Sequence, residues 1–448
     1  MISINRDGLR AHPFGDDAIE ILEAGLAAID PATRVAAFLS VVQDELCVGE
    51  LSFSLAGRRI WILAIGKASV PMANAAGRIL GRERIAGGVA VTRTGYGGPT
   101  DCVRVIEAGH PLPQGTDGAD AVIDIASQVK PDDVVVCLLS GGGSALLACP
   151  PMGVRLADVA RTTELLLHSG VTIDQMNTVR RHMSRLQGGQ LMALLYPATV
   201  ITLILSDVIG DRLESIASGP TVPDPTSFAD ACAVLERAML FDRIPYSIRN
   251  HLLSGVALKV SDTPKCGDPI FETAHTFLIG NNQTAVDALA ARASERGFEV
   301  HSCCEPLTGE ARDIGCRLAD QAKELRARAT TKWALVGGGE TTVAVRGEGL
   351  GGRNQELALA AALQLEGVTG LSVATLATDG TDGPTSAAGA LIDGDTAALA
   401  RERGIDPADA IDRNDSHCVL AATHDLLWTG PTNTNVADLV LILGAPIA

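Results

Sequence analysis

Short runs of β-branched and other apolar residues alternate along this chain with longer segments that repeat with the period of an α-helix. At 121–129, for example, the apolar positions 121, 122, 125, 126 and 129 form one face of a helix. Another helix is predicted over Asn281–Arg296, with a cap at Asn281 or Asn282 and a stop at Gly297. Because strand and helix alternate, the sequence predicts an α/β fold with parallel sheets that helices cover on both faces.

The predicted strands fall into two series along the chain. The first series is Ile60–Ile65, Gly88–Thr92, Val103–Glu107, Val134–Leu139 and Val200–Leu205, and the second is His275–Ile279, Phe298–His301, Trp333–Val336, Thr342–Val345, Leu371–Ala377 and Leu439–Leu443. A chain of 448 residues is too long for one ordinary core. The stretch Leu253–Pro269, with scattered Gly, Pro, Ser and Asp, is typical of a junction. We therefore expect two domains, residues 1–265 and 266–448.

The balance of charge limits the partners that this chain can have. There are 36 Lys and Arg residues against 53 Asp and Glu residues, which gives a formal net charge of −17. An acidic surface repels nucleic acid and anionic lipid, so we expect neither as a partner. The ten cysteines lack a C-x-x-C or zinc-ligand spacing, and no run nears the roughly 18 apolar residues of a membrane span. Together with a polar segment at Met1–Asp17, these features predict a cytoplasmic protein that acts on small molecules, and a homo-oligomer is left open.

Two of the predicted strands run directly into three consecutive glycines. Val134–Leu139 is followed by Ser140, Gly141, Gly142, Gly143 and Ser144, and Trp333–Val336 is followed by Gly337, Gly338, Gly339 and Glu340. A strand that ends at residues without side chains exposes backbone N–H groups at its carboxyl end, where ligands bind in open α/β sheets. Such groups can hold phosphate oxygens, and we expect Ser144 to cap a short following helix. The sequence therefore predicts nucleotide or phosphate binding at Ser140–Ser144 and at Gly338, Gly339 and Glu340.

Two segments of the first half could bring positive charge to such a ligand. Lys67 follows the strand Ile60–Ile65, but the P-loop pattern fails because Trp61 stands where its first glycine is required. A lysine at the mouth of an apolar strand is nevertheless more often functional than a plain surface residue. Arg180 and Arg181 are adjacent and cannot share one face of a helix. At most one of the two is expected to reach a site, and solvated charge is the alternative for both.

A further cation, Arg353, lies in the second half directly after flexible glycines. Asn354 is expected to cap a helix over Gln355–Leu365, which would place Arg353 beside the positive end of the helix dipole. Packing explains an arginine at such a position poorly. It suits a bidentate grip on a carboxylate or a phosphate group.

Carboxylates follow two further strands. Asp207 comes almost directly after Val200–Leu205, with Asp211 four residues later, and such a pair could hold Mg²⁺ together with water and phosphate oxygens. Asp379 and Asp382 lie in a Gly- and Thr-rich loop, where they could bind metal or accept a proton from a substrate hydroxyl. The alternatives are an Asx-turn at Asp207 and a simple Asp-Gly turn at Asp379.

This set of groups is what phosphoryl transfer requires. Glycine-rich loops, isolated cations and isolated carboxylates would stabilise spread phosphate charge, hold a metal and position the attacking oxygen. No histidine pairs convincingly with a Ser or Cys nucleophile, and His110 is the one histidine in a strand-end loop. Glycines at 347, 349 and 352 satisfy the dinucleotide pattern G-x-G-x-x-G, but no acidic residue follows at the expected distance for a ribose contact.

Several motifs, in this order, resemble those of the class II glycerate 2-kinases, also called the MOFRL-type glycerate kinases. They are Gly66–Ser69, Gly109–Pro111, Ser140–Leu147, Asn177–Arg180, Ser206–Asp211, Gly351–Glu356, Thr378–Gly383 and Gly430–Val436, and they span nearly the whole chain. The resemblance implies an enzyme dependent on ATP and Mg²⁺ that converts D-glycerate into 2-phosphoglycerate. It also implies a Rossmann-like N-terminal domain, a second α/β domain of MOFRL type, and an active site in the cleft between them.

The active-site lysine and arginine of that family match Lys67 and Arg353. With the resemblance, we expect Lys67, Arg353 and Asp382 to be catalytic, with Asp379 as the alternative to Asp382, and Asp207 and Asp211 to bind metal. Asn177, Arg180 and Asn354 are expected to bind substrate. The alternatives are an NAD(P)H-dependent hydroxypyruvate reductase, a label that members of the family have carried, and a nucleotide sensor without catalysis.

Overall fold

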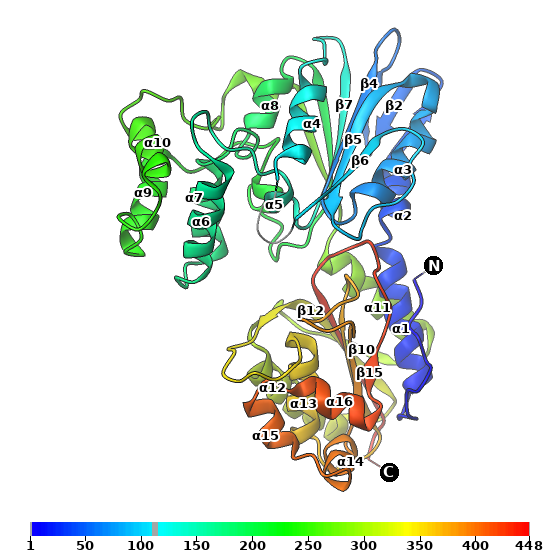
Figure 1. Cartoon of the computed structure of the whole chain (residues 1–448). Helices are drawn as coiled ribbons and strands as arrows, with labels where there is room; N and C mark the ends of the chain where they lie inside the picture. Colours follow the sequence, from blue (N-terminus) through cyan, green and yellow to red (C-terminus); the bar gives the residue numbers. More distant parts are fainter. Residues whose placement is uncertain (1, 110–114, 448) are drawn as a thin grey trace. The chain divides into compact units, whose positions relative to one another are not determined.

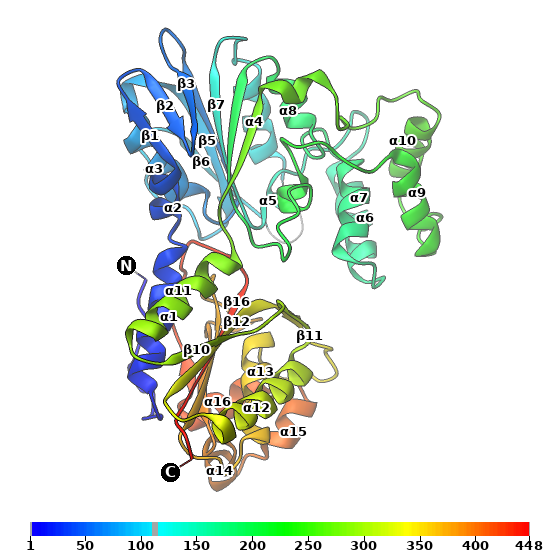
Figure 2. The same ribbon diagram turned by 180° about the vertical axis from the view of Figure 1, so that it is seen from behind.

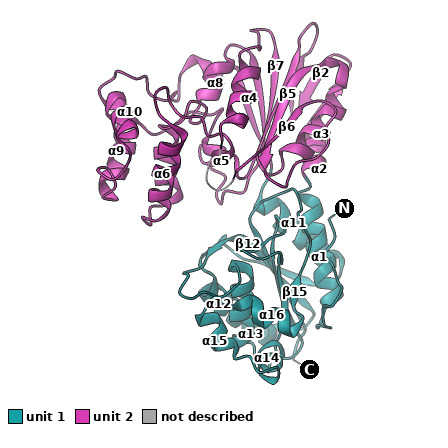
Figure 3. Cartoon of the chain, in the orientation of Figure 1, with its two compact units in different colours: residues 1–30, 280–448 teal, residues 31–279 magenta. Residues whose placement is uncertain are grey.

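The computed structural model describes residues 2–109 and 115–447, and His110 therefore lies outside the described residues. The chain forms two compact units: unit 1 is residues 1–30 and 280–448, and unit 2 is residues 31–279 (Figure 3). The sequence predicted one boundary, at 265, whereas the compact units meet along the chain at 30/31 and 279/280. A single boundary along the sequence cannot describe these units, because the first thirty residues pack with the second half of the chain.

Unit 2 contains the predicted parallel sheet (Figure 1). In spatial order its strands are β6 (Arg104–Ala108), β5 (Ile85–Arg93), β4 (Ile60–Ile65), β7 (Val134–Ser140), β8 (Thr199–Leu205) and β9 (Ala274–Gly280). The pairs from β6 to β8 are all parallel. Every residue of β4 and β7 is buried, as expected for strands whose two faces are both covered. The carboxyl ends of β4, β7 and β8 therefore lie along one edge of the sheet.

Helices and a small second sheet complete unit 2. The helices are α2 (Pro31–Phe38), α3 (Ser69–Leu80), α4 (Asp117–Ala126), α5 (Gly143–Leu146), α6 (Leu156–Leu167), α7 (Ile173–Arg181), α8 (Gln190–Leu195), α9 (Phe228–Arg237) and α10 (Tyr246–Val256). Helices α6, α7, α9 and α10 share an apolar core of their own and stand beside the sheet as a helical lobe (Figure 1). Strands β1 (Leu39–Val42), β2 (Glu45–Val48) and β3 (Leu51–Ser54) form an antiparallel sheet that the sequence did not predict.

The sheet of unit 1 is mixed, so the prediction of a second parallel sheet is wrong. Its strands are β10 (Glu299–Ser302), β12 (Trp333–Thr342), β16 (Asp438–Gly444), β13 (Leu371–Ala377), β14 (Gly389–Asp393) and β15 (Leu426–Leu427) in spatial order, with β11 (Leu307–Glu310) also paired to β12. Strand β16 runs antiparallel to both of its neighbours. The connection from β13 to β14 contains no helix, which suits antiparallel neighbours because they need no crossover.

The helices of unit 1 are α1 (Gly15–Ala28), α11 (Asn282–Glu295), α12 (Ala311–Arg328), α13 (Arg353–Gln364), α14 (Thr396–Glu402), α15 (Pro407–Asp412) and α16 (Ser416–Thr423). The predicted helix at 281–296 is confirmed, with Asn281 as its N-cap. Helix α1 packs against α11 (Figure 2), and a Cβ at Gly25 would lie 2.9 Å from Leu289 Cδ2. This close contact is one reason why the first residues belong to unit 1. Among the residues described, no helix is both long and apolar enough to cross a bilayer.

Candidate functional sites in the two units

In unit 2 the loop that carries Lys67 lies against the first triple-glycine loop. Strands β4 and β7 are neighbours, and the backbone N–H of Lys67 donates to the carbonyl oxygen of Gly141 at 3.0 Å. The N–H of Ala68 donates to Ser140 Oγ, also at 3.0 Å. A Cβ at Gly66 would overlap Ser140, so this close approach requires glycine. Two motifs more than seventy residues apart are thus held together, and Lys67 is only 8% exposed.

Helix α5 begins at Gly143, and the prediction that Ser144 caps it is wrong. The N-cap is Gly142, whose φ of 86° lies in the left-handed region that favours glycine. Ser144 instead forms a side-chain network: its Oγ is 2.8 Å from Ser218 Oγ, and the Ser218 hydroxyl donates to Asn177 Oδ1 at 3.3 Å. The structure therefore brings two predicted site residues, Ser144 and Asn177, into one hydrogen-bonded chain.

The residue that joins this chain, Ser218, sits in an unusual backbone conformation that the sequence did not predict. Ala217, Ser218 and Gly219 have φ values of 50°, 58° and 62°. Two successive non-glycine residues in the left-handed region are strained and persist only where packing enforces them. Here a Cβ at Gly143 would lie 2.6 Å from Ala217 Cβ, so the strained turn packs directly on the glycine loop. The sole sequence signal was the Gly-Pro pair that follows.

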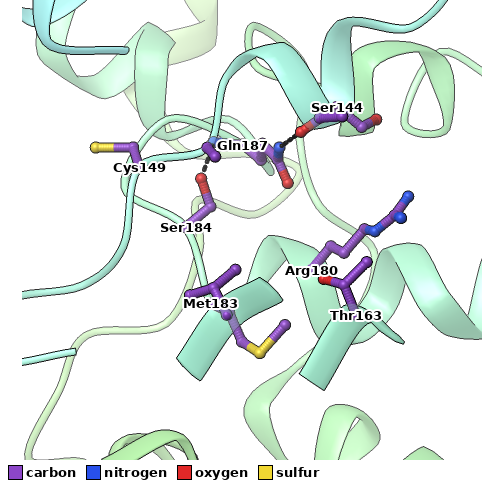
Figure 4. Close-up of a pocket in the computed structure, with 10 residues that line it drawn as sticks. Ser144, Cys149, Thr163, Arg180, Met183, Ser184 and Gln187 are labelled. Atoms are coloured by element: carbon purple, nitrogen blue, oxygen red, sulfur yellow. Dashed lines mark hydrogen bonds between the residues drawn. The ribbon is translucent and has the colours of Figure 1, made fainter. Parts of the chain in front are cut away.

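The adjacent arginines at the end of α7 have different surroundings. Arg181 is 3% exposed, its Nε lies 2.8 Å from Asp224 Oδ1, and it donates to the carbonyl oxygen of Glu214. Arg180 lines a cavity with Ser144 and Gln187 (Figure 4). Burial lowers the pKa of Arg180, and no carboxylate among residues 2–109 and 115–447 acts against that. Arg181 thus serves packing, whereas Arg180 faces the cavity.

The predicted metal ligands lie in the turn after β8. The Asp211 N–H donates to the carbonyl oxygen of Val208 at 3.0 Å, and Asp211 has a φ of 51°. Across residues 2–109 and 115–447 there is no group of three or more His, Cys, Asp or Glu side chains arranged for a metal ion. A metal at Asp207 and Asp211 would therefore take most of its ligands from nucleotide and water, and this assignment stays a prediction.

In unit 1, Arg353 is the first residue of α13, which begins earlier than predicted. The N-cap is Gly352, so the prediction that Asn354 caps the helix is wrong. Asp382 satisfies the helix N-terminus in its place: Oδ1 accepts the Asn354 N–H at 3.1 Å and Oδ2 accepts the Gln355 N–H at 2.8 Å. A Cβ at Gly352 would collide with Asp382, which explains the glycine there. Asp382 thus fixes the position of the helix end that carries Arg353.

Arg353 is held by two carboxylates. Its Nη1 donates to Glu340 Oε1 at 2.6 Å, and its Nε lies 2.5 Å from Asp438 Oδ2. Asn354 Nδ2 donates to Asp438 Oδ1 at 2.9 Å. Burial raises the pKa of Asp438 to about 7, although Arg353 and Asn354 favour its charged form. Burial alone would lower the pKa of Arg353, but Asp438 and Glu340 offset this and raise it.

The prediction therefore found Arg353, Asn354, Asp382 and Glu340, which the structure brings together, but missed Asp438. Its only sequence signal was a position directly before the predicted strand Leu439–Leu443. Asp382 also lies near Asp438, and burial raises its pKa too. Asp379 Oδ1 accepts the N–H of Thr381 at 3.2 Å, which fits the alternative of an Asp-Gly turn.

The second triple glycine does not end a strand, and that prediction is wrong. Gly337, Gly338 and Gly339 lie inside β12, which pairs with β16 on one side and with β10 and β11 on the other. A Cβ at Gly338 would collide with Asn282, and one at Gly339 with the backbone of Leu307. These glycines allow close packing within unit 1, and no open strand end supports the phosphate-binding role predicted for Gly338 and Gly339.

The fold and these sites define a class: a two-unit α/β protein with a glycine loop and a buried lysine at the carboxyl edge of its parallel sheet. A domain family of unknown function, DUF4147, matches residues 17–253, and the MOFRL family matches residues 333–438. The glycerate 2-kinase of Pyrococcus horikoshii is 41% identical over 95% of this chain and 98% of its own length. The crystal structure of the glycerate kinase of Thermotoga maritima aligns with a TM-score of 0.83 at 39% identity, over 96% of this chain and 99% of that one.

A protein of Agrobacterium vitis, named provisionally as a hydroxypyruvate reductase, is 37% identical over 94% of this chain and 93% of its own length. Matches of this extent establish kinship across both units. The chain belongs to the MOFRL-type glycerate kinase family.

Proposed function

We propose that this protein is a kinase that transfers a phosphoryl group from ATP to the 2-hydroxyl of D-glycerate, giving 2-phosphoglycerate and ADP. The observation that carries this proposal is the match over nearly the full length to a protein named glycerate 2-kinase. The contact between the Lys67 loop and the Ser140–Ser144 loop supports it, because phosphoryl transfer needs a cation and bare backbone amides close together.

In this proposal Lys67 stabilises the charge that spreads over the transferring phosphoryl group. The Ser140–Ser144 loop holds nucleotide phosphates, with Gly142 in the left-handed conformation that favours glycine. Both groups belong to unit 2. Burial of Lys67 supports this role, since a charge stabilises a transition state more strongly where water is excluded.

Arg353 supplies the second cation of the proposed reaction, and its neighbours set its position. Glu340 and Asp438 fix the guanidinium, while Asp382 fixes the helix end. The carboxylate oxygens of Asp382 accept hydrogen bonds from the backbone and side-chain amides of Asn354 and Gln355. We therefore assign Asp382 to positioning Asn354 and Arg353, with orientation of the substrate hydroxyl left to Asp382 or Asp379.

Mg²⁺ is the expected metal of an ATP-dependent kinase, and Asp207 with Asp211 would hold it. Mg²⁺ is a hard cation that binds one or two protein carboxylates and completes its coordination shell with water and phosphate oxygens. When bound, Mg²⁺ neutralises charge on the β- and γ-phosphates. The backbone N–H of Asp211 donates to the carbonyl oxygen of Val208, which closes the turn after β8 that carries both residues.

The reductase alternative is weakened by the surroundings of its sequence pattern. At each of the three glycines of G-x-G-x-x-G a Cβ would collide with the chain's own atoms: those of Arg413 at Gly347, of Asp415 at Gly349 and of Asp382 at Gly352. The dinucleotide fingerprint uses glycines to let a pyrophosphate approach. Here packing within unit 1 already accounts for all three glycines.

A coupled assay of ADP release tests the proposal. With D-glycerate, ATP and Mg²⁺ we expect steady ADP formation that stops when a chelator removes the metal. NADH oxidation with hydroxypyruvate and no use of ATP would favour the reductase. ATP binding without ADP formation on addition of glycerate would favour a sensor.

A further inference from the structure

Arg180 of unit 2 is partly buried and has no counter-ion among the described residues. Arg181, its neighbour, shows how a buried arginine is normally satisfied, through Asp224 and backbone acceptors. For Arg180, in contrast, the part of the chain that the structure describes provides neither an ion pair nor a side-chain hydrogen bond. An unpaired guanidinium in a chain with a net charge of −17 is unexpected, because carboxylates outnumber cations.

None of the described residues that line the cavity beside Arg180 is acidic. Its polar lining is Ser144, Thr163, Arg180, Ser184 and Gln187, and the remaining lining residues are Ala145, Ala148, Cys149, Val159 and Met183 (Figure 4). The cavity volume is about 30 Å³ on a scale on which one water needs about 10–15 Å³. It therefore has room for a group of about two or three heavy atoms. A carboxylate fits this space, and a triphosphate does not.

Hydrogen bonds within the protein fix two polar side chains of the cavity, those of Gln187 and Ser144. Gln187, 3% exposed, donates from Nε2 to the carbonyl oxygen of Ser144 at 2.7 Å. The Ser144 hydroxyl is tied through Ser218 to Asn177. Asn177 and Arg180 are three residues apart on α7 and therefore share one helix face. The strained turn at Ala217 and Ser218 thus positions neighbours of Arg180, which is a use for which proteins retain strain.

We propose that this cavity is the subsite for the carboxylate of the acid substrate, and that Arg180 is the residue that makes the enzyme specific for an acid. The inference rests on the proposed kinase function and deepens it. A guanidinium offers two parallel N–H donors that match the two oxygens of a carboxylate.

Arg353 is a poorer candidate for that role. Glu340 and Asp438 already occupy its guanidinium, so a substrate carboxylate would have to displace one of them or add to the negative charge. Arg180 offers an anion a positive charge that no described carboxylate neutralises. The two arginines thus take separate tasks in the proposed reaction.

Substrate discrimination in Arg180 variants tests the proposal. We would measure kcat/KM for D-glycerate, for its neutral amide glyceramide and for ATP in the wild type, in Arg180→Met and in Arg180→Lys. In Arg180→Met we expect kcat/KM for D-glycerate to fall about 100-fold, the scale of losing a charged hydrogen-bonded pair, while the values for glyceramide and ATP change less than about twofold. Arg180→Lys keeps the charge without the fork and should recover part of the loss.

Arg185→Met is the matched control, because Arg185 is an exposed arginine in the same segment and does not line this cavity. Thermal unfolding of each variant reports whether it folds. Unchanged discrimination between D-glycerate and glyceramide in Arg180→Met would overturn the proposal, and so would a rise in KM confined to ATP, which would indicate a phosphate site.

If the wild type forms no ADP, the proposed function fails by itself. Calorimetric titration of D-glycerate into the wild type and Arg180→Met then decides the subsite. Weaker binding by the variant would support it, whereas equal binding, or no binding to either protein, would overturn it.

Discussion

The two triple-glycine segments look alike in sequence and differ in structure. In unit 2 the strand β7 ends at Ser140, and the following glycines open into a turn and a short helix. In unit 1 the strand β12 continues through Gly337–Gly339 to Thr342, because β16 and β11 pair with it on both sides. The same pattern therefore ends a strand and opens into a turn in unit 2, whereas in unit 1 it lies inside a paired strand.

The arginines near the two glycine segments also differ, because one is paired with carboxylates and the other is not. Next to β12, Glu340 and Asp438 neutralise Arg353 within unit 1. Beside the glycine loop of unit 2, Arg180 faces a cavity whose described lining residues include no acid. Unit 1 thus pairs Arg353 with its own carboxylates, whereas in unit 2 Arg180 lines a cavity. The experiments below test this contrast, starting with the largest expected effect.

Removal of Lys67 should have the largest effect. Lys67→Ala should lower kcat by at least about 100-fold, the scale expected for one preorganised charge in a transition state, and Arg353→Ala should do the same. Steady-state kinetics of ADP release would measure both. Lys130→Ala, at an exposed lysine of unit 2, is the control and should keep normal turnover. Near-normal turnover in the Lys67 and Arg353 variants would remove both sites from the reaction.

Substituting alanine for a glycine in each of the two segments should distinguish a glycine needed for packing from a glycine needed for ATP binding. Gly339→Ala places a Cβ on the backbone of Leu307, which cannot move aside, and should lower the free energy of unfolding by about 2–3 kcal/mol. Gly142→Ala carries the cost of a left-handed conformation, about 1–2 kcal/mol, and should also raise KM for ATP. Chemical denaturation would measure the free energy of unfolding of both variants, and steady-state kinetics would measure their KM for ATP. Equal losses of stability with no change in KM for ATP would mean that both segments serve packing alone.

This contrast also marks what the sequence could predict. The strands Ile60–Ile65 and Leu371–Ala377 were predicted to the residue, because continuous apolar runs between turn residues define buried strands. The mixed strand directions of the second sheet were not predicted. Strand β16 lies at the C-terminal end of the sequence, and its direction in the sheet depends on tertiary pairing.

In the candidate sites, too, features with a local sequence signal were predicted and features that depend on tertiary contacts were not. Lys67 and Arg353 stand out in the sequence because each follows glycine at the end or start of a regular element. Asp438 and Ser218 could not be identified, because their roles come from partners far along the chain, namely Arg353 and the pair Ser144 and Asn177.

The carboxylate partner of Arg353 should give the activity a pH dependence. With burial raising the pKa of Asp438 to about 7, lowering the pH through this value protonates Asp438 and takes one negative partner from Arg353. We expect wild-type kcat to fall on the acid side of about pH 7. Asp438→Asn should lower kcat about tenfold at pH 8 and lack that acid limb, since the amide does not titrate. The same limb in the variant would assign it to another group.

The smallest expected effect concerns a buried cluster that ties the N-terminal segment to unit 1. Arg10 donates to both oxygens of Asp393, and Arg10 Nε lies 2.6 Å from Asp425. His12, whose side chain is fully buried, lies 3.0 Å from Asp393 and 3.2 Å from Asp425. Burial lowers the pKa of His12, but the two carboxylates outweigh this and raise it above the usual value, with Arg10 opposing them.

Because the pKa of His12 is raised on folding, its contribution to stability is complete below about pH 6.5 and is lost as the pH rises through the folded value. His12→Gln should therefore cost about 1 kcal/mol of unfolding free energy at pH 6 and less at pH 9. Urea denaturation at the two pH values would measure this, with the exposed His168 changed to Gln as the control. An equal cost at both pH values would mean that His12 acts by packing. The ion pairs of His12 with Asp393 and Asp425 would then not stabilise unit 1, and the contrast with the unpaired Arg180 of unit 2 would be weaker.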